Sequence, residues 1–207
     1  MNITSHEISG LVLSGGRGTR MGHVDKGLLP IDDITLVEAS LRRLQPQVGS
    51  LMINANTNLV QYQRFGFPVW PDEITGYAGP LAGLHAGLSH CATPYLISVP
   101  CDTPGFPLDL VDRLSFALRV AAADVAYAVT GDSPSLELHP VFCLLKRELL
   151  PSLDAYLRAG GRKVAGWLQQ QHYTQAHFSD QTAFMNLNTQ DDLKAFISQR
   201  RPGNKAD

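Results

Sequence analysis

Leu13-Ser-Gly-Gly-Arg-Gly-Thr-Arg-Met-Gly-His-Val-Asp-Lys26 is the most informative stretch of the chain, and it continues directly from the apolar run Ile8–Leu13. Its four glycines allow backbone N–H groups to approach an anion closely, as in turns that bind phosphate. Arg17, Arg20 and Lys26 add the positive charge that a polyphosphate needs. An ordinary flexible loop is the alternative, but glycines and cations that coincide after a strand favour phosphate binding.

The spacing of the glycines excludes two common phosphate-binding loops. A P-loop reads Gly-x-x-x-x-Gly-Lys-Ser/Thr, whereas Lys26 is followed by Gly27 and not by a hydroxyl residue. The dinucleotide fingerprint reads Gly-x-Gly-x-x-Gly, whereas the count from Gly16 through Gly18 ends on Met21. The stretch is therefore neither a Walker loop nor a standard dinucleotide turn.

Length and composition indicate one globular domain of ordinary charge. At 207 residues and 44% hydrophobic, the chain can bury one full core, which we expect to span 1–200 with a flexible tail at 201–207. A net charge of −2 argues against a broad attraction to nucleic acid or to a membrane surface. No apolar run approaches the roughly 20 residues that span a bilayer. The three widely spaced cysteines form neither a disulfide framework nor a zinc pattern, which favours a reducing, cytoplasmic setting.

Strand-like and helix-like segments alternate along the chain, which predicts an α/β fold with an open, mostly parallel sheet and helices on both faces. The strands are expected at Ile8–Leu13, Ser50–Asn54, 67–70, 95–99, 125–129 and 140–145, with an edge strand at 176–178. The helices are expected at 35–44, 59–64, 79–88, 107–122, 147–158, 163–171 and 191–199.

Polar and glycine residues follow the carboxyl ends of several expected strands. In open α/β sheets the ligand lies outside these ends, so 14–16, Asn54, Asp72 and Asp102 are expected to converge on one crevice. A carboxylate at this place suits Mg²⁺, which takes one or two carboxylates and completes its shell with water and substrate phosphates. Asp102 could instead cap the helix at 107–122.

The glycine-rich stretch resembles the signature loop of nucleotidyltransferases with a Rossmann-like fold. Within that superfamily it resembles the molybdenum cofactor guanylyltransferase (MobA-type) family, whose pattern is Leu-Ala-Gly-Gly, a spacer, Arg-Met-Gly, two residues and Asp-Lys. The matching segments here are Leu13-Ser-Gly-Gly16, Arg20-Met-Gly22 and Asp25-Lys26. Two residues depart from this pattern, because Ser14 replaces the usual alanine and Gly18 replaces the usual serine. Gly18 creates a Gly-Thr-Arg sequence that resembles the loop of sugar-phosphate nucleotidyltransferases. The pair Asp25-Lys26 nevertheless favours the molybdopterin branch.

The resemblance implies a transferase that moves GMP from GTP to the terminal phosphate of molybdopterin, with Mg²⁺ as cofactor and Mn²⁺ as the alternative. The implied catalytic residues are Arg20, Lys26 and Asp102, and Asp102 is also the implied metal ligand. The implied nucleotide-binding residues are Leu13, Ser14, Gly15, Gly16, Lys26, Asn54, Asp72, Gly79 and Asp102. The implied molybdopterin-binding residues are Arg162, Asn186 and Asn188, which puts nucleotide binding in the N-terminal half and molybdopterin binding in the C-terminal half.

Several of these assignments also have a purely structural alternative. Asp72 is also suited to a turn, and Asn56, two residues after Asn54, is suited to cap a helix. The small residues of 79–83 could serve helix packing as well as a nucleotide pocket. His139 belongs to a His-Pro pair of the family, but a lone histidine is more often structural than catalytic.

Other functions also remain open at this point. A cytidylyltransferase acting on the same pterin, or a sugar-1-phosphate nucleotidyltransferase, would share the fold; Gly15-Gly16 in place of an Ala-Gly pair favours guanine. A non-catalytic nucleotide-binding regulator is a second class, because fold alone does not establish activity. Molybdoenzymes or their chaperones are the partners to which the product would pass.

Overall fold

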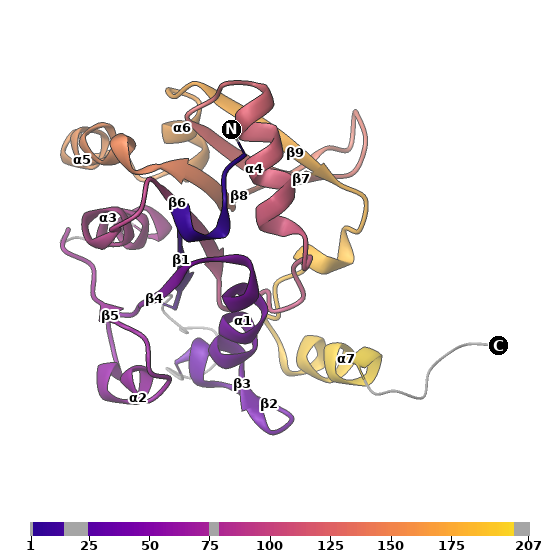
Figure 1. Cartoon of the computed structure of the whole chain (residues 1–207). Coiled ribbons are helices and arrows are strands. Elements are labelled where there is room, and N and C mark those ends of the chain that lie inside the picture. Colours follow the sequence, from indigo (N-terminus) through magenta and orange to yellow (C-terminus); the bar gives the residue numbers. More distant parts are fainter. Residues whose placement is uncertain (1, 15–24, 75–78, 201–207) are drawn as a thin grey trace.

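The computed structural model describes residues 2–14, 25–74 and 79–200. Its main sheet has seven strands in the order β5-β4-β1-β6-β8-β7-β9 (Figure 1). The strands are β1 (Ile8–Leu13), β4 (Ser50–Asn54), β5 (Val69–Trp70), β6 (Tyr95–Pro100), β7 (Val125–Thr130), β8 (Glu137–Lys146) and β9 (Tyr173–Phe178). A separate two-stranded hairpin, β2 (Pro30–Ile31) with β3 (Ile34–Thr35), was not among the expected strands.

The sheet is mostly parallel, as predicted. β1 lies between the parallel strands β4 and β6, β5 continues the parallel order beyond β4, and β9 runs parallel to β7. β8 is antiparallel to both β6 and β7, so its first residues lie at the same edge of the sheet as the last residues of β6 and β7. Because the chain moves from β1 outward to β4 and β5 and then returns to β6, the ends of β1 and β6 flank a topological switch point.

Helices cover both faces of the sheet (Figure 1). On one face α1 (Leu36–Leu44) and α4 (Leu110–Val120) share an apolar core with Val12, Ile53 and Val99 of the sheet. On the other face α3 (Pro80–His90), α5 (Leu150–Arg158) and α6 (Val164–Leu168) pack against Leu11, Met52 and Leu145. Successive strand residues therefore face opposite cores, which is why the central strands read as continuous apolar runs.

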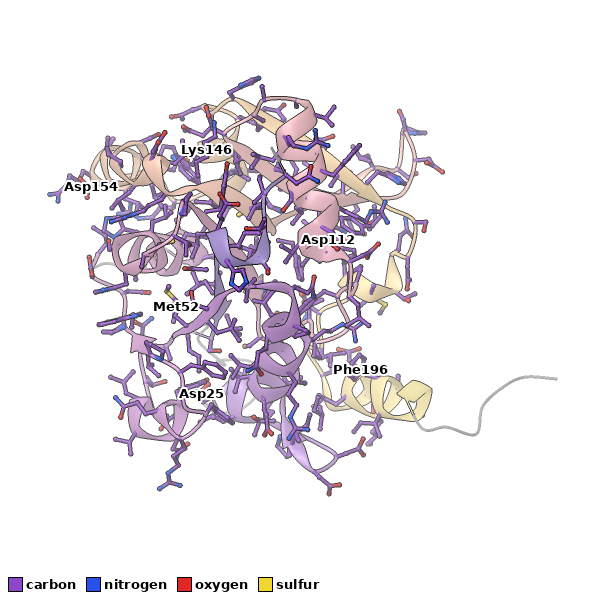
Figure 2. The ribbon with its side chains drawn as sticks, viewed as in Figure 1. Asp25, Met52, Asp112, Lys146, Asp154 and Phe196 are labelled. Atoms are coloured by element: carbon purple, nitrogen blue, oxygen red, sulfur yellow. The ribbon has the colours of Figure 1, made fainter. Side chains whose placement is uncertain are left out.

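Two further helices lie at the border of this core. α2 (Leu59–Gln63) precedes β5, and α7 (Gln190–Arg200) packs Leu193 and Phe196 against residues of α1 and of the β2–β3 hairpin (Figures 1 and 2). Short 3-10 turns occupy Ser5–Glu7, Lys26–Leu28, Gln45–Gln47, Arg147–Leu149 and Thr182–Phe184. The helical part of the prediction is confirmed, with ends that shift by up to three residues.

Several expected boundaries differ from the observed ones, and proline accounts for two of the differences. β5 begins at Val69 instead of residue 67, because Pro68 has no N–H to donate to a neighbouring strand. α5 begins at Leu150, after a 3-10 turn, and carries a proline in its first turn. β8 begins at Glu137, three residues before the expected start at Pro140, and β9 begins at Tyr173, three residues before the expected 176.

Gly83 of α3 is a position where the fold and the site depend on a missing side chain. A Cβ at Gly83 would collide with the Asn54 side chain and lie 2.5 Å from Leu13 Cδ2, so the helix packs directly on the ends of β1 and β4. We expect Gly83→Ala to lower the free energy of unfolding by about 2 kcal/mol, because overpacking outweighs the gain in helix propensity. Urea unfolding followed by circular dichroism measures this change.

Gly166→Ala in α6 is the matched control. A Cβ there would meet the end of the Tyr156 side chain at 2.9 Å and Lys163 Cβ at 3.6 Å. This variant should unfold at the wild-type urea concentration or slightly above it. Equal effects of the two substitutions would contradict the close packing of α3 on Asn54.

Candidate active site

A cavity of about 840 Å³ opens at the carboxyl ends of β1, β4 and β6. The ends of these strands are tied together by the backbone: Ser14 N donates to Asn54 O at 2.8 Å, and Cys101 N donates to Leu13 O at 3.0 Å. The predicted site residues that line the cavity are Leu13, Ser14, Lys26, Asn54, Asp72, Gly79, Asp102, Asn186 and Asn188. Gly15, Gly16 and Arg20 lie outside the described residues.

Arg162 is the predicted site residue that the structure places apart from the others. It does not line the cavity, and its guanidinium donates to the backbone carbonyls of Leu157 at 3.0 Å and Gly161 at 2.7 Å. In this position it closes the turn after α5. Its assignment to molybdopterin therefore has no support from the observed geometry.

Lys26 joins three segments that are distant in the sequence. Its Nζ donates to Asp102 Oδ2 at 2.7 Å and to Asn188 Oδ1 at 2.5 Å. The Lys26 and Asp102 side chains are only 18% and 22% exposed, so water screens their charges less than at an open surface. The positive charge at the end of the glycine-rich stretch thus meets the carboxylate that follows β6.

Asp25 holds the backbone from which Lys26 projects, and sequence reasoning gave it no role beyond the motif. Its carboxylate accepts hydrogen bonds from Gly27 N at 3.2 Å, Tyr62 Oη at 2.5 Å, Thr57 Oγ1 at 3.1 Å and Asn58 Nδ2 at 3.0 Å. Figure 2 shows Asp25 in the lower half of the molecule, near α2. Burial, followed by the hydrogen bond to Asp25, raises the pKa of Tyr62 far above its ordinary value, so this hydroxyl stays a donor.

The backbone around Asp102 connects β6 with the C-terminal segment before α7. Asp102 O accepts from Leu187 N at 2.8 Å, and Thr103 Oγ1 donates to Asn186 Oδ1 at 2.6 Å. Asp102 does not cap the following helix, because the N-cap residue of α4 is Asp109. Burial and the negative charge of Asp102 raise the pKa of the Cys101 thiol to about 12, which keeps this neighbour protonated.

Asp72 is oriented by two asparagines. Asn54 Nδ2 donates to Asp72 Oδ1 at 2.9 Å and to Trp70 O at 3.0 Å, while its side chain lies buried under α3. Asn56 Nδ2 donates to Asp72 Oδ2 at 2.8 Å, and its Oδ1 accepts from Asp72 N at 2.8 Å. Asn56 therefore supports Asp72 and does not cap α2, whose N-cap residue is Asn58.

Gly79 brings the start of α3 to the cavity. Its backbone has φ 61° and ψ −146°, a conformation that only glycine adopts without strain, and Pro80 follows in the first turn of the helix. The unpaired N–H groups of a helix start carry partial positive charge and suit an anionic or polar ligand. Packing and ligand binding are both compatible with this element.

The side chains that could ligate a metal in the cavity fit a cation that takes few ligands from the protein. Within the described ranges, no group of three His, Cys, Asp or Glu residues lies together as a metal site. Asp102 instead offers one partly buried carboxylate at a strand end that lines the cavity. This arrangement suits Mg²⁺, which binds through one or two carboxylates together with substrate phosphates and water.

The sheet order and the cavity at its switch point define a nucleotidyltransferase fold, which solved structures share. "Molybdopterin-guanine dinucleotide biosynthesis protein A" from Archaeoglobus fulgidus superposes with a TM-score of 0.74 at 20% identity, over 92% of this chain and 97% of that one. The 4-diphosphocytidyl-2C-methyl-D-erythritol synthase from Anaerococcus prevotii superposes with a TM-score of 0.71 at 10% identity, over 94% of this chain and 96% of that one. At these identities the likeness concerns the fold.

Sequence comparison narrows this class to one family. The family model described as MobA-like NTP transferase domain matches residues 10–175. The molybdenum cofactor guanylyltransferases of Bordetella petrii and Cupriavidus necator are 49% and 48% identical to the chain, each over 93% of it and over 98% and 97% of their own lengths. The chain therefore belongs to the MobA-like NTP transferase family. Among its described helices, none combines the length and the apolar character needed to cross a membrane.

The Asp25 cluster leads to a prediction on stability. Tyr62→Phe removes one charge-assisted hydrogen bond from a buried place, and we expect the free energy of unfolding to fall by about 2 kcal/mol. Tyr156→Phe is the control, because its hydroxyl donates to Lys163 O at 3.3 Å in an exposed setting. Chemical unfolding of both variants measures the difference, and an unchanged Tyr62→Phe midpoint would show that the cluster does not hold the segment around Lys26.

Proposed function

We propose that this nucleotidyltransferase moves a GMP group from GTP to the terminal phosphate of molybdopterin, with release of pyrophosphate. The observation that carries the proposal is the contact of Lys26 with both Asp102 and Asn188. It joins the end of the glycine-rich stretch to the carboxylate of β6 and to the C-terminal segment at one cavity. The names of the relatives that are nearly half identical over almost the whole chain support the same reaction.

The proposed reaction needs positioning and charge stabilisation more than covalent help from the protein. A terminal phosphate oxygen of molybdopterin attacks the α-phosphorus of GTP, the bond between the α-phosphorus and the bridging oxygen breaks, and pyrophosphate leaves with that oxygen. The attacking phosphate is already ionised at neutral pH, so no general base is required. Arg20 and Lys26 balance the charge on the α-phosphate and on the departing pyrophosphate.

Asp102 is the proposed ligand of Mg²⁺, with Mn²⁺ as the alternative. When bound, such an ion supplies positive charge next to the transferring phosphates. The chain's own contribution is to keep the carboxylate in place: the Asp102 backbone is bonded to Leu187, and its side chain is bonded to Lys26. A protonated Cys101 beside it stays outside the chemistry.

The nucleotide is proposed to bind along the N-terminal strand ends, and molybdopterin along the C-terminal segments. The proposed backbone contacts to the nucleotide come from Leu13, Ser14, Gly15, Gly16 and Gly79. Asp72, which is hydrogen-bonded to Asn54, would offer acceptor oxygens to the base or the ribose. Asn186 and Asn188 are the proposed contacts to molybdopterin. Arg162 is also proposed to bind molybdopterin, although it lies apart from the cavity. We further propose that residues 1–200 form one domain, that the reaction takes place in the cytoplasm and that molybdoenzymes or their chaperones receive the product.

Loss of either partner of the Lys26–Asp102 pair should stop the reaction. We expect Lys26→Ala and Asp102→Ala to lower the rate of dinucleotide formation at least about 100-fold, because each removes charge stabilisation at the transferring phosphate. Pyrophosphate release in the presence of GTP and molybdopterin measures the rate. Circular dichroism checks that the variants are folded.

The Lys146–Asp124 pair provides a matched control. It has the same 2.7 Å separation as the Lys26–Asp102 pair, and neither residue lines the cavity. Figure 2 shows Lys146 near the top of the molecule, well away from Asp25. Lys146→Ala should keep wild-type turnover, and full activity of Lys26→Ala or Asp102→Ala would remove that residue from the mechanism.

A comparison of nucleotides tests the base. We expect pyrophosphate release with GTP and none with CTP, ATP or UTP when molybdopterin is the acceptor. Preference for CTP would move the chain to the cytidylyltransferases. Binding of GTP without any pyrophosphate release would instead indicate a nucleotide-binding regulator.

A further inference from the structure

The start of β8 departs from the regular ladder at the edge of the cavity. Tyr127 of β7 pairs with Cys143, but the next residue, Ala128, pairs with His139, so one step on β7 corresponds to four on β8. The residues between, 140–142, bulge out of the ladder and line the cavity. Pro140 is tolerated there because a bulged residue needs no ladder hydrogen bond. Bulges of this kind re-aim side chains near active sites.

His139 directly precedes the bulge, and its imidazole ring is contacted on one face and at one edge. Its Nε2 lies 2.8 Å from Oγ1 of the buried Thr130. Its ring stacks on Phe184 with centroids 4.6 Å apart and planes within 17°, and it meets Phe142 edge-on at 6.5 Å. Desolvation by burial lowers the pKa of His139 below its ordinary value, so the ring is neutral near pH 7.

His139 is half-buried, its ring stacks on Phe184, and the residue is part of the cavity wall. Leu138 and Met185, which adjoin His139 and Phe184 in the sequence, also line the cavity and are 41% and 58% exposed. With Phe142 and Phe184 they give the cavity apolar and aromatic groups, beside which Glu137 is a charged lining residue. A flat heterocycle can stack on the apolar and aromatic groups and keep its polar edges free for the polar lining residues.

We propose that His139 is a specificity-determining residue that stacks on the pterin ring of the acceptor. The chemical class of the ligand, a flat heterocycle, follows from the place of the half-buried His139 ring in the cavity wall and from the apolar and aromatic residues that line the cavity with it. The location agrees with the chain path, because Phe184 and Met185 lead directly into Asn186, which is bonded to Thr103 next to Asp102. The identity of the heterocycle as a pterin rests on the proposed function.

Steady-state kinetics with both substrates test this role. His139→Gln keeps a polar group near Thr130 but removes the ring, and we expect the KM for molybdopterin to rise about tenfold, the usual scale of one lost base–aromatic stack. The KM for GTP should stay at the wild-type value. His139→Phe keeps the ring and the packing on Phe184, so its KM for molybdopterin should remain near wild type.

The control is His177→Gln, because His177 lies on β9, bonds Gly131 O at 2.7 Å and does not line the cavity. A KM for molybdopterin that is unchanged in His139→Gln, or that rises equally in His139→Phe, would overturn stacking by this ring. A rise confined to the KM for GTP would assign the wall to the guanine base and would also overturn the proposal.

Direct binding separates this inference from the proposed function. Titration with 6-hydroxymethylpterin, followed by quenching of its fluorescence, should show binding to the wild type and to His139→Phe, and about tenfold weaker binding to His139→Gln. If the wild type and His139→Phe bind this probe more tightly than His139→Gln, but the wild type makes no dinucleotide from GTP and molybdopterin, the proposed function fails and stacking of the pterin on His139 stands. If the wild type does not bind the probe but forms the dinucleotide at a normal rate, stacking of the pterin on His139 fails and the proposed function stands.

Discussion

The ion pair between Lys26 and Asp102 is the interaction on which the site depends. It joins the end of the glycine-rich stretch to the end of β6, and the bond from Lys26 to Asn188 adds the segment before α7. Because both side chains are mostly buried, loss of one partner leaves a charge with little water to compensate it. The pair therefore fixes two charged groups in the cavity wall, and through Asn188 it connects the two halves of the chain.

A second layer of side chains keeps the functional groups in place. Asp25 gathers four hydrogen bonds and holds the turn that carries Lys26, while Asn54 and Asn56 orient both oxygens of Asp72. Asn54 is itself confined by the close approach of Gly83. Such support matters for group transfer, since errors of about 1 Å in the position of a reacting group cost large factors in rate.

The strands of the main sheet, the helices and the convergence of Asn54, Asp72 and Asp102 could be predicted because they follow from local patterns and from one general rule for parallel sheets. The role of Asp25 could not, because its partners Thr57, Asn58 and Tyr62 lie 32 to 37 residues further along the chain. The same limit explains the irregular start of β8, which no periodicity in the sequence marks.

The sequence by itself determined the family and the place of a carboxylate just after β6, and it predicts phosphate binding by the glycine-rich stretch, because residue type and spacing carry this information. The tertiary structure alone decided which polar groups meet. It brought Asn188 to Lys26, set Arg162 apart from the cavity and placed His139 in the cavity wall, stacked on Phe184. The contacts of Asn188 and His139 join segments that are distant in the sequence, and packing of that kind leaves no local signal in the chain.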